Sequence, residues 1–334
     1  MKKIRDAGKP LGEYVNGEIY RGVLTGLNEA FVIDKATKKR LIAEDPKSAE
    51  IIKPFLAGRD IKRYETPKAN SFLIFTRRGI EIDKYPAIKA YLEQYKERLM
   101  PKPANFKGKW QGRKPGKYAW YEIQDTVAYW EKFEEPKIIY AEISQSGNFA
   151  LDYAAQYSDT TTYILPVASK PLLGVLNSKL FAFIFSNISS EIRGGFFRWK
   201  RQYMEKMPLP KNIESAKELS DFVDSIAKKT QKFKIQQQKF LKRLQTNFDL
   251  DKLSKKLETF YEHNFKTLMK ELKKKKVTLS LKEQDEWEEY FESYRNELLE
   301  LKAEIDKTDQ EIDEMVYALY EFSEEEIAVV EAYL

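Results

Sequence analysis

The feature that most constrains the fold of this chain is an apolar repeat near its C-terminus. From Trp287 onward, large apolar residues recur at alternating spacings of four and three, and Thr308 fills one position of the series. Such spacing keeps the apolar side chains on one side of a helix for more than four heptads. The series consists of Trp287, Phe291, Tyr294, Leu298, Leu301, Ile305, Ile312, Met315 and Leu319.

A second, less regular apolar stripe precedes this repeat. Two long helices packed antiparallel and bridged by residues 249–281 would bury the two stripes against each other. Self-association through the same repeat is the competing interpretation, and it would make the chain a helical adaptor between proteins. The second stripe consists of Leu219, Phe222, Ile226, Phe233, Phe240 and Leu244.

The charges of the chain are also divided. Residues 1–210 contain 36 Lys and Arg against 24 Asp and Glu, whereas residues 211–334 contain 22 against 28. The sign changes at Pro208-Leu-Pro210, so we predict two domains, residues 1–210 and residues 211–334. A basic, aromatic-rich domain attached to a helical one is typical of a nucleic-acid-binding domain with a spacer.

Short apolar runs separated by helical patterns predict an α+β fold with a mixed sheet for the first domain. The expected strands are two short ones within residues 19–33, followed by residues 71–75, 137–143, 149–153 and 161–165. The expected helices cover residues 45–55, 85–99 and 172–185.

The residue inventory offers little for catalysis. The chain has no cysteine and a single histidine, His263. It has no glycine-rich phosphate loop, no Asn-Pro-Pro-aromatic methyltransferase signature and no zinc motif. Asp125, Glu135 and Lys137 match a loose magnesium-nuclease pattern, so a stand-alone nuclease is an alternative function. Pro136 at the start of a strand explains the same residues without catalysis.

No apolar segment of 18 residues occurs, and the absence of cysteine is compatible with a reducing compartment. We therefore expect a cytoplasmic protein without a membrane partner.

The first domain does contain a sequence pattern that is typical of DNA binding. Residues 101–121 contain three prolines, three glycines, six basic residues and no acidic residue. Cations neutralise DNA phosphates, and arginine or glutamine can also read base edges in the major groove. The predicted DNA contacts here are Lys107, Lys109, Trp110, Gln111, Arg113, Lys114 and Lys117. A solvated loop whose tryptophans anchor it to the core is the alternative.

Three further basic segments are candidates for DNA contact. In residues 193–203 two glycines permit close backbone approach, and Arg193, Arg198, Lys200 and Arg201 are predicted DNA contacts. Arg77 and Arg78 follow a strand and form a weaker set. The run 273–276 consists of four lysines between expected helices, where a solvated turn is favoured and phosphate contact is the alternative.

Several stretches together resemble the C-terminal half of TaqI-type adenine-N6 DNA methyltransferases and of the related fused type IIG restriction–modification enzymes. They occur in the order found in that family, from about residue 12 to the end of the chain. They include residues 19–33, Pro54-Phe-Leu-Ala-Gly-Arg-Asp-Ile-Lys-Arg-Tyr64, 118–121 with 136–139, 159–166, 172–179, 202–210, and 312–320 with 324–327.

The resemblance implies a target recognition domain for double-stranded DNA, followed by spacer helices. In the family the methyl-transfer site lies upstream of the first matching stretch, so the chain resembles a fragment of a larger enzyme or a stand-alone specificity chain. S-adenosylmethionine and Mg²⁺ are then implied only for the full-length enzyme. Its methyltransferase and endonuclease modules would lie in the same polypeptide or in a partner chain. We expect Arg59 and Asp60 to form an internal ion pair or a loop anchor.

Overall fold

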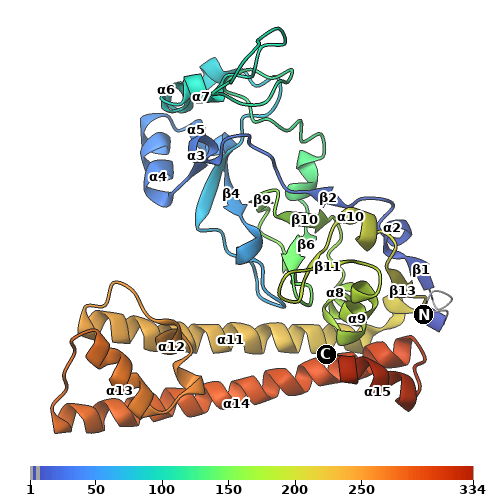
Figure 1. Cartoon of the computed structure of the whole chain (residues 1–334), viewed down its shortest axis with the longest axis vertical. Helices are drawn as coiled ribbons and strands as arrows, with labels where there is room; N and C mark the ends of the chain where they lie inside the picture. The colour runs from blue at the N-terminus through green and yellow to red at the C-terminus, as the bar shows by residue number, and fades with distance from the viewer. Residues whose placement is uncertain (1–2, 5–7, 334) are drawn as a thin grey trace. The chain divides into compact units, whose positions relative to one another are not determined.

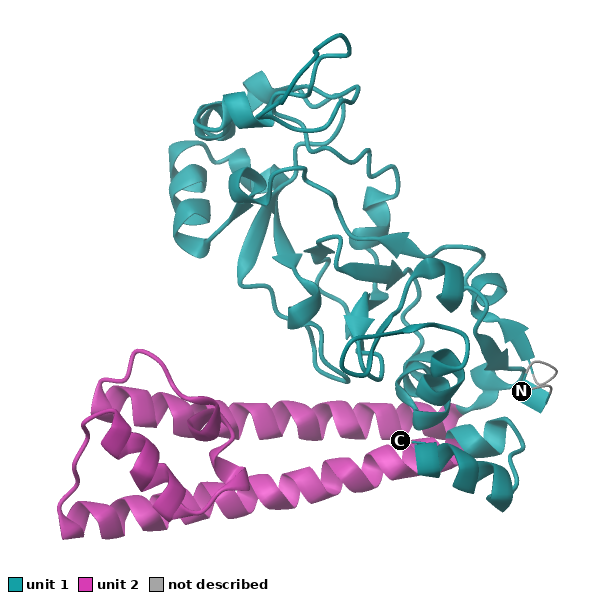
Figure 2. Ribbon diagram, in the orientation of Figure 1, with its two compact units in different colours: residues 1–216, 316–334 teal, residues 217–315 magenta. Residues whose placement is uncertain are grey.

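The chain divides into two compact units in a computed structural model that describes residues 3–4 and 8–333. Unit 1 comprises residues 1–216 and 316–334, and unit 2 comprises residues 217–315 (Figure 2). No helix in the described part of the chain is long and apolar enough to span a bilayer.

Unit 1 is built on two four-stranded sheets. The first has the order β2-β10-β6-β8 and is antiparallel throughout. The second has the order β3-β5-β4-β9, in which β4 and β9 run parallel and the other neighbours antiparallel. The strands are β2 (Tyr20–Arg21), β3 (Val32–Ile33), β4 (Ile52–Leu56), β5 (Ser71–Ile74), β6 (Lys137–Ala141), β8 (Phe149–Asp152), β9 (Tyr157–Ser158) and β10 (Thr162–Leu165).

One apolar core joins the two sheets. It draws Phe55 and Leu73 from the mixed sheet and Ile139 and Ile164 from the antiparallel sheet, all at most 4% exposed. The helices around these sheets are α2 (Leu11–Tyr14), α3 (Asn28–Phe31), α4 (Lys35–Glu44), α5 (Ser48–Ile51), α6 (Pro86–Glu93), α7 (Lys96–Leu99), α8 (Lys170–Asn177), α9 (Lys179–Ser186) and α10 (Arg201–Met204). Single 3-10 turns are η1 (Gly58–Asp60), η2 (Ile82–Lys84), η3 (Trp130–Phe133) and η4 (Ile213–Ser215).

Two smaller sheets complete unit 1. β11 (Glu191–Ile192) and β12 (Phe196–Arg198) form a hairpin that pairs with β7 (Ile143–Ser144), and β1 (Gly8–Pro10) pairs with β13 (Pro208–Pro210). Trp199 follows the hairpin, is fully buried, and stacks on Phe185 with ring centroids 3.8 Å apart. Its indole N–H donates to the carbonyl of Ser144, so a buried ring anchors the hairpin.

The α+β architecture with a mixed sheet is as predicted, but two of the expected helices differ from the structure. Residues 45–55 form only a short α5 before β4, because strand pairing with β5 and β9 overrides the helix signals of Asp45 and Pro46. The two strands expected within residues 19–33 are present and belong to different sheets: β2 pairs with β10, and β3 pairs with β5. The helix predicted over 172–185 is divided at Ser178, whose hydroxyl accepts from Phe181 N and caps α9.

Residues 316–334 return to unit 1, so the structure divides the chain differently from the predicted break at residue 210. The hydroxyl of Tyr320 donates to the carbonyl of Pro208 at 2.7 Å, in β13. In α15 (Glu324–Tyr333), Glu331 forms an ion pair with Lys179 of α9 at 2.7 Å. These contacts make the C-terminal segment part of the basic unit despite its own acidic sequence.

Unit 2 is a pair of long helices, α11 (Lys217–Phe248) and α14 (Leu281–Leu319), of which residues 316–319 belong to unit 1 (Figure 1). The pairs Lys229 with Thr308 and Gln236 with Glu297 fix an antiparallel direction. Thr308 occupies the predicted gap in the seam: it is 2% exposed and accepts from Lys229 Nζ. The predicted antiparallel helix pair is therefore confirmed, and α11 covers the seam that self-association would require.

The bridge between the long helices is itself folded. It contains α12 (Lys255–Glu258), a 3-10 turn η5 (Phe260–Glu262) and α13 (Phe265–Lys274). Phe240 of α11 and Phe260 of the turn stack with centroids 3.8 Å apart, and both lie in one cluster with Leu272 and Phe291. The bridge thus packs onto the ends of both long helices and has a core of its own.

Candidate nucleic-acid interface

The basic loop over residues 101–121 is organised around one buried cation. The guanidinium of Arg113 is 4% exposed and donates to five backbone carbonyls, those of Leu99, Thr25, Glu122, Ala119 and Trp120, at 2.7–3.3 Å. Because these bonds occupy its donors, Arg113 has none left for a base. Burial lowers the pKa of Arg113 to about 10, which leaves it charged at neutral pH. The prediction of Arg113 as a DNA contact was therefore wrong.

Arg78 has the same structural role. It donates to the carbonyls of Ile123 at 2.5 Å and Gln124 at 2.7 Å, and its guanidinium lies 3.6 Å from the carboxylate of Glu122. Glu122 also accepts from the backbone N–H groups of Gly79 and Ala119. This network joins the turn after β5 to the basic loop, so Arg78 anchors that loop, and its predicted DNA contact stays a prediction.

The other predicted contacts in the loop and in the turn after β5 lie at or near the surface. Trp110 is half-buried, donates its indole N–H to the carbonyl of Met100 and packs edge-on against Phe106. Arg77 is exposed and stacks over the ring of Trp130 at 4.7 Å. The predicted contacts of the loop that the fold leaves exposed are Lys107, Lys109, Gln111, Lys114 and Lys117.

The hairpin of β11 and β12 presents the second predicted cluster. Gly194 and Gly195 have φ angles of 84° and 76°, a left-handed conformation that favours glycine and closes the turn tightly. Arg193 and Arg198 are exposed, and Lys200 is partly exposed. Arg201 is exposed but donates to the carbonyl of Gly17 and lies 3.5 Å from Glu205, so it is partly engaged.

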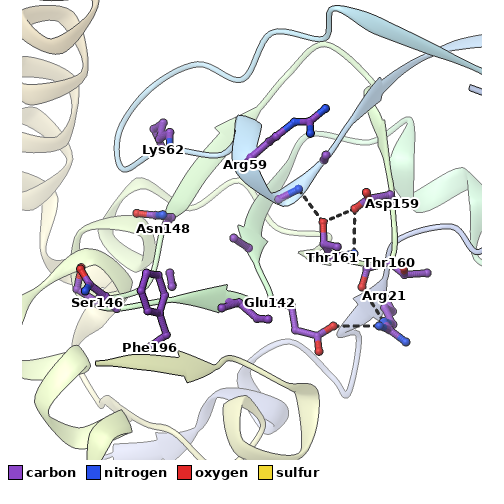
Figure 3. A pocket seen from close by; sticks show the side chains of 16 residues that line it. Arg21, Arg59, Lys62, Glu142, Ser146, Asn148, Asp159, Thr160, Thr161 and Phe196 are labelled. Atoms are coloured by element: carbon purple, nitrogen blue, oxygen red, sulfur yellow. Dashed lines mark hydrogen bonds and ion pairs between the residues drawn. The ribbon is translucent and has the colours of Figure 1, made fainter. Parts of the chain in front are cut away.

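Beside this hairpin lies a hollow of about 650 Å³ that sequence reasoning missed. Figure 3 shows Arg59 and Lys62 on one side of it and Ser146 and Phe196 on the other. Arg59 and Lys62 are exposed, and neither forms an ion pair with any residue that the structure describes. Asn148 also lines the hollow, half-buried. We define this set, Arg59, Lys62, Gln145, Asn148 and Phe196, as the hairpin hollow.

The backbone around Arg59 explains why it projects outward. Gly58 donates its N–H to the hydroxyl of Thr161 at 2.8 Å, and a Cβ at this position would lie 2.7 Å from the Thr161 carbonyl. The carboxylate of Asp60 accepts from Ala57 N at 2.8 Å and closes the turn. Asp60 is thus the expected loop anchor, while Arg59 between these two residues is exposed rather than ion-paired with it. The sequence did carry a signal for this exposed cation, because Arg59 stands between the turn-forming residues Gly58 and Asp60 shortly after a strand.

On the opposite side of the hollow the charges are balanced internally. Arg21 forms an ion pair with the nearly buried Glu142 at 3.0 Å and donates to the carbonyl of Thr160 at 2.9 Å. Gln145 donates to the carbonyl of Gly194 at 3.2 Å, which orients its amide at the base of the hairpin turn. The hollow therefore has two cations without an ion pair to any described residue, Arg59 and Lys62, on one side, and the side-chain amides of Gln145 and Asn148 near the hairpin.

The three residues of the nuclease alternative do not form a site. Lys137 is fully buried and lies 2.6 Å from the carboxylate of Asp152, with a further hydrogen bond to the carbonyl of Phe133. Glu135 is exposed and pairs with Lys132 at 3.3 Å. Within residues 3–4 and 8–333, no group of three His, Cys, Asp or Glu side chains is arranged to hold a metal ion.

Comparisons with known proteins agree with these features. Residues 53–209 match the family described as the TaqI-like C-terminal specificity domain, and residues 212–316 match a family of domains of unknown function, DUF8810. The type II methyltransferase M.BstVI of Geobacillus stearothermophilus is 24% identical over 196 residues, which cover 57% of this chain and 32% of that protein.

A solved structure of the type IIL restriction–modification enzyme MmeI in complex with DNA has a similar fold, with a TM-score of 0.52 and 16% identity. The match covers 95% of this chain and 34% of that one. The chain thus spans about a third of the length of these two proteins. These matches confirm the resemblance noted in the sequence: residues 53–209 are similar to the TaqI-like C-terminal specificity domain.

Proposed function

We propose that unit 1 binds duplex DNA in a sequence-selective way and supplies target recognition to a restriction–modification methyltransferase. The observation that carries this proposal is the specificity-domain match over residues 53–209. The exposed, unneutralised cations on the hairpin, the hairpin hollow and the loop over residues 101–121 support it, because cations of this kind bind DNA phosphates.

Within the hairpin hollow, the residues divide into two roles. Arg59 and Lys62 bind phosphates and set the register of the duplex. The amides of Gln145 and Asn148 read base edges, because an amide can donate to and accept from adenine in the major groove. Phe196, 38% exposed on β12, offers apolar contact to a thymine methyl group or a sugar.

The other predicted contacts act mainly on the backbone. In Figure 1 the basic loop lies beside α6 and α7, at one end of unit 1, while β11 lies well away from it. Separate surfaces on one compact unit favour phosphate contacts spread along the duplex over a single recognition loop. The residues proposed for these contacts are Arg77, Lys107, Lys109, Gln111, Lys114, Lys117, Arg193, Arg198, Lys200 and Arg201. Trp110, whose indole N–H donates to the Met100 carbonyl, would contact DNA only through its ring.

Chemistry on the bound DNA belongs to another module in this proposal. That module, in the same polypeptide or in a partner chain, would use S-adenosylmethionine to methylate an adenine rotated out of the stack. A nuclease module of the full-length enzyme would use Mg²⁺. The role of this chain is to hold the duplex so that the target base meets that module.

The test begins with selection of duplexes from a randomised pool by the full chain. Binding of the enriched sequence and of a scrambled duplex is then measured by fluorescence anisotropy at several salt concentrations. The double variant Arg59→Gln/Lys62→Gln should weaken both duplexes and reduce the salt slope by about 2, because each lost phosphate contact removes about 0.9. Asn148→Ala should instead weaken mainly the enriched duplex.

Lys35→Gln/Lys39→Gln is the matched control, because both lysines are exposed on α4 of the same unit and the net charge changes equally. If the control and Arg59→Gln/Lys62→Gln lower affinity equally, the hairpin hollow is not the interface. Failure of the pool to enrich any sequence would overturn the proposed recognition function itself.

A further inference from the structure

Unit 2 separates its charges more sharply than its composition suggests. Residues 228–276 contain 16 Lys and Arg against 5 Asp and Glu, while residues 281–314 contain 4 against 14. The second half of α11 and the bridge are therefore strongly basic, and α14 is strongly acidic. The net negative charge of residues 211–334 is therefore the sum of a strongly basic segment and a strongly acidic one.

Helix α13 directs its lysines away from the core. Phe265, Leu268 and Leu272 are at most 8% exposed and pack in the apolar cluster of unit 2. Lys270, between Leu268 and Leu272, and Lys273, directly after Leu272, are exposed. An amphipathic helix of this kind holds its cations at fixed positions on the surface.

A buried carboxylate fixes α12 against α13. Glu271 is 6% exposed and accepts from the hydroxyl of Ser254, the N-cap of α12, at 2.7 Å. Lys274 donates to the other oxygen of Glu271 at 2.6 Å, and this bond lowers the pKa of the Glu271 carboxyl. Glu271 thus anchors the two helices. Its ion pair is with Lys274, whereas Lys256 lowers the pKa of the Glu271 carboxyl only through space.

Those lysines surround a hollow of about 480 Å³ between α12 and α13. Its lining consists of Lys256, Thr267, Lys270, Glu271, Lys273 and Lys274. Lys256, Lys270 and Lys273 form no ion pair with any residue that the structure describes. We name these three residues the lysine cradle. Three cations held at one hollow repel one another, and an anion placed there relieves that repulsion.

We propose that the lysine cradle binds the phosphates of duplex DNA, and that unit 2 is a second, sequence-independent DNA-binding element. Exposed Lys239, Lys242, Lys252 and Lys255 extend the positive surface beyond the hollow. An extended series of cations suits a polyanion with regularly spaced charges better than a single small anion. The choice of DNA among polyanions rests on the proposed function of unit 1. Lysines carry no base code, so this element adds affinity without selectivity.

The test compares two triple variants of the full chain, Lys256→Gln/Lys270→Gln/Lys273→Gln and Lys282→Gln/Lys302→Gln/Lys307→Gln. The second is a matched control, because it removes three positive charges from the acidic helix α14 of the same unit. Binding of a random-sequence duplex is measured by anisotropy between 50 and 200 mM salt. The triple Lys→Arg variant of the cradle keeps the charges and should keep the affinity.

The cradle variant should lower the salt slope by about 2.7 and weaken binding near 0.1 M salt at least about 10-fold, since each phosphate contact contributes about 0.9 to the slope. The α14 control should leave the slope unchanged. The melting temperature, followed by circular dichroism, should be the same for the wild-type chain and for both cradle variants, because the cradle lysines are exposed.

Equal slopes for the cradle variant and the α14 control would overturn the proposal. It would also be overturned if the cradle variant lost binding to anionic phospholipid vesicles but kept full DNA affinity. The ratio of affinities for the enriched and random duplexes should not change, because both lose the same contacts. A pool that enriches no sequence would refute recognition by unit 1, whereas the random-duplex slopes would still decide the role of the cradle.

Discussion

Arg113 allows the sharpest distinction between a structural cation and a DNA contact. Its guanidinium is buried and donates to five backbone carbonyls that come from three parts of the chain: the turn at Thr25, the end of α7 at Leu99, and residues 119–122. Replacement by methionine leaves an apolar side chain of similar length facing those carbonyls. The fold then loses the bonds and retains several unsatisfied acceptors.

The expected cost follows from these contacts. A hydrogen bond to a charged donor contributes about 1.5–3 kcal/mol, but five bonds to one group are not additive, and losing one partner of a buried charged network costs about 3–5 kcal/mol. With an m-value of about 2 kcal/mol/M in urea, Arg113→Met should lower the unfolding midpoint of unit 1 by about 2 M. Arg113→Lys should recover only part of this loss, because an ammonium has three donors at one point.

Urea titration followed by tryptophan fluorescence measures this effect, since Trp110 and Trp120 lie in the same loop. Arg98→Gln is the control, because the pair of Arg98 and Glu29 is exposed at 49% and 59% and contributes at most about 1 kcal/mol. The reasoning is refuted if Arg113→Met leaves the midpoint unchanged while DNA affinity falls, which is the behaviour of a base or phosphate contact.

Two further substitutions test the packing of unit 1. Lys137→Met should destabilise the fold by about 3–5 kcal/mol, because it leaves the buried Asp152 carboxylate without its cation. Lys137→Met/Asp152→Asn should recover part of that loss in the same urea assay, since the amide removes the charge and still accepts from the backbone N–H of Ala154 or Gln156; equal stability of the two variants would contradict this. Tyr320→Phe should cost about 1–2 kcal/mol by removing the bond to the Pro208 carbonyl, and hydrogen exchange in α15 should accelerate; unchanged exchange there would contradict the docking of the C-terminal segment.

Sequence alone predicted the features that depend on local periodicity. The four–three spacing from Trp287 identified α14, and even the polar position at Thr308 fits, because Lys229 of α11 reaches it. The strand at residues 71–75 was also predicted, since a short apolar run between turn residues is a local pattern.

What escaped prediction depends on distant partners. Pro54 lies in β4 rather than in a helix, because β5 and β9 pair on either side of that strand. Composition grouped Arg113 with Lys114, yet one is buried by carbonyls from Thr25 and Leu99 and the other is exposed. A basic run shows how many cations a loop has. Only the fold shows which of them are engaged in internal hydrogen bonds.

The same limitation hid the hairpin hollow and the lysine cradle. Arg59 and Lys62 come from the segment after β4, whereas Gln145 and Asn148 lie beyond β7, and no local spacing links them. In unit 2, Glu271 lies among lysines in the sequence, and only the fold shows that it forms an ion pair with Lys274 and none with Lys256 or Lys273.

The measurement that tests the central claim most directly is the ratio of two dissociation constants for the full chain at about 0.15 M salt. One is for the duplex enriched from a random pool, and the other is for the same duplex with its bases scrambled. Sequence-selective recognition predicts a ratio of about 10³ or more in favour of the enriched duplex. A ratio within a few-fold of one would mean that these basic surfaces bind DNA without reading it.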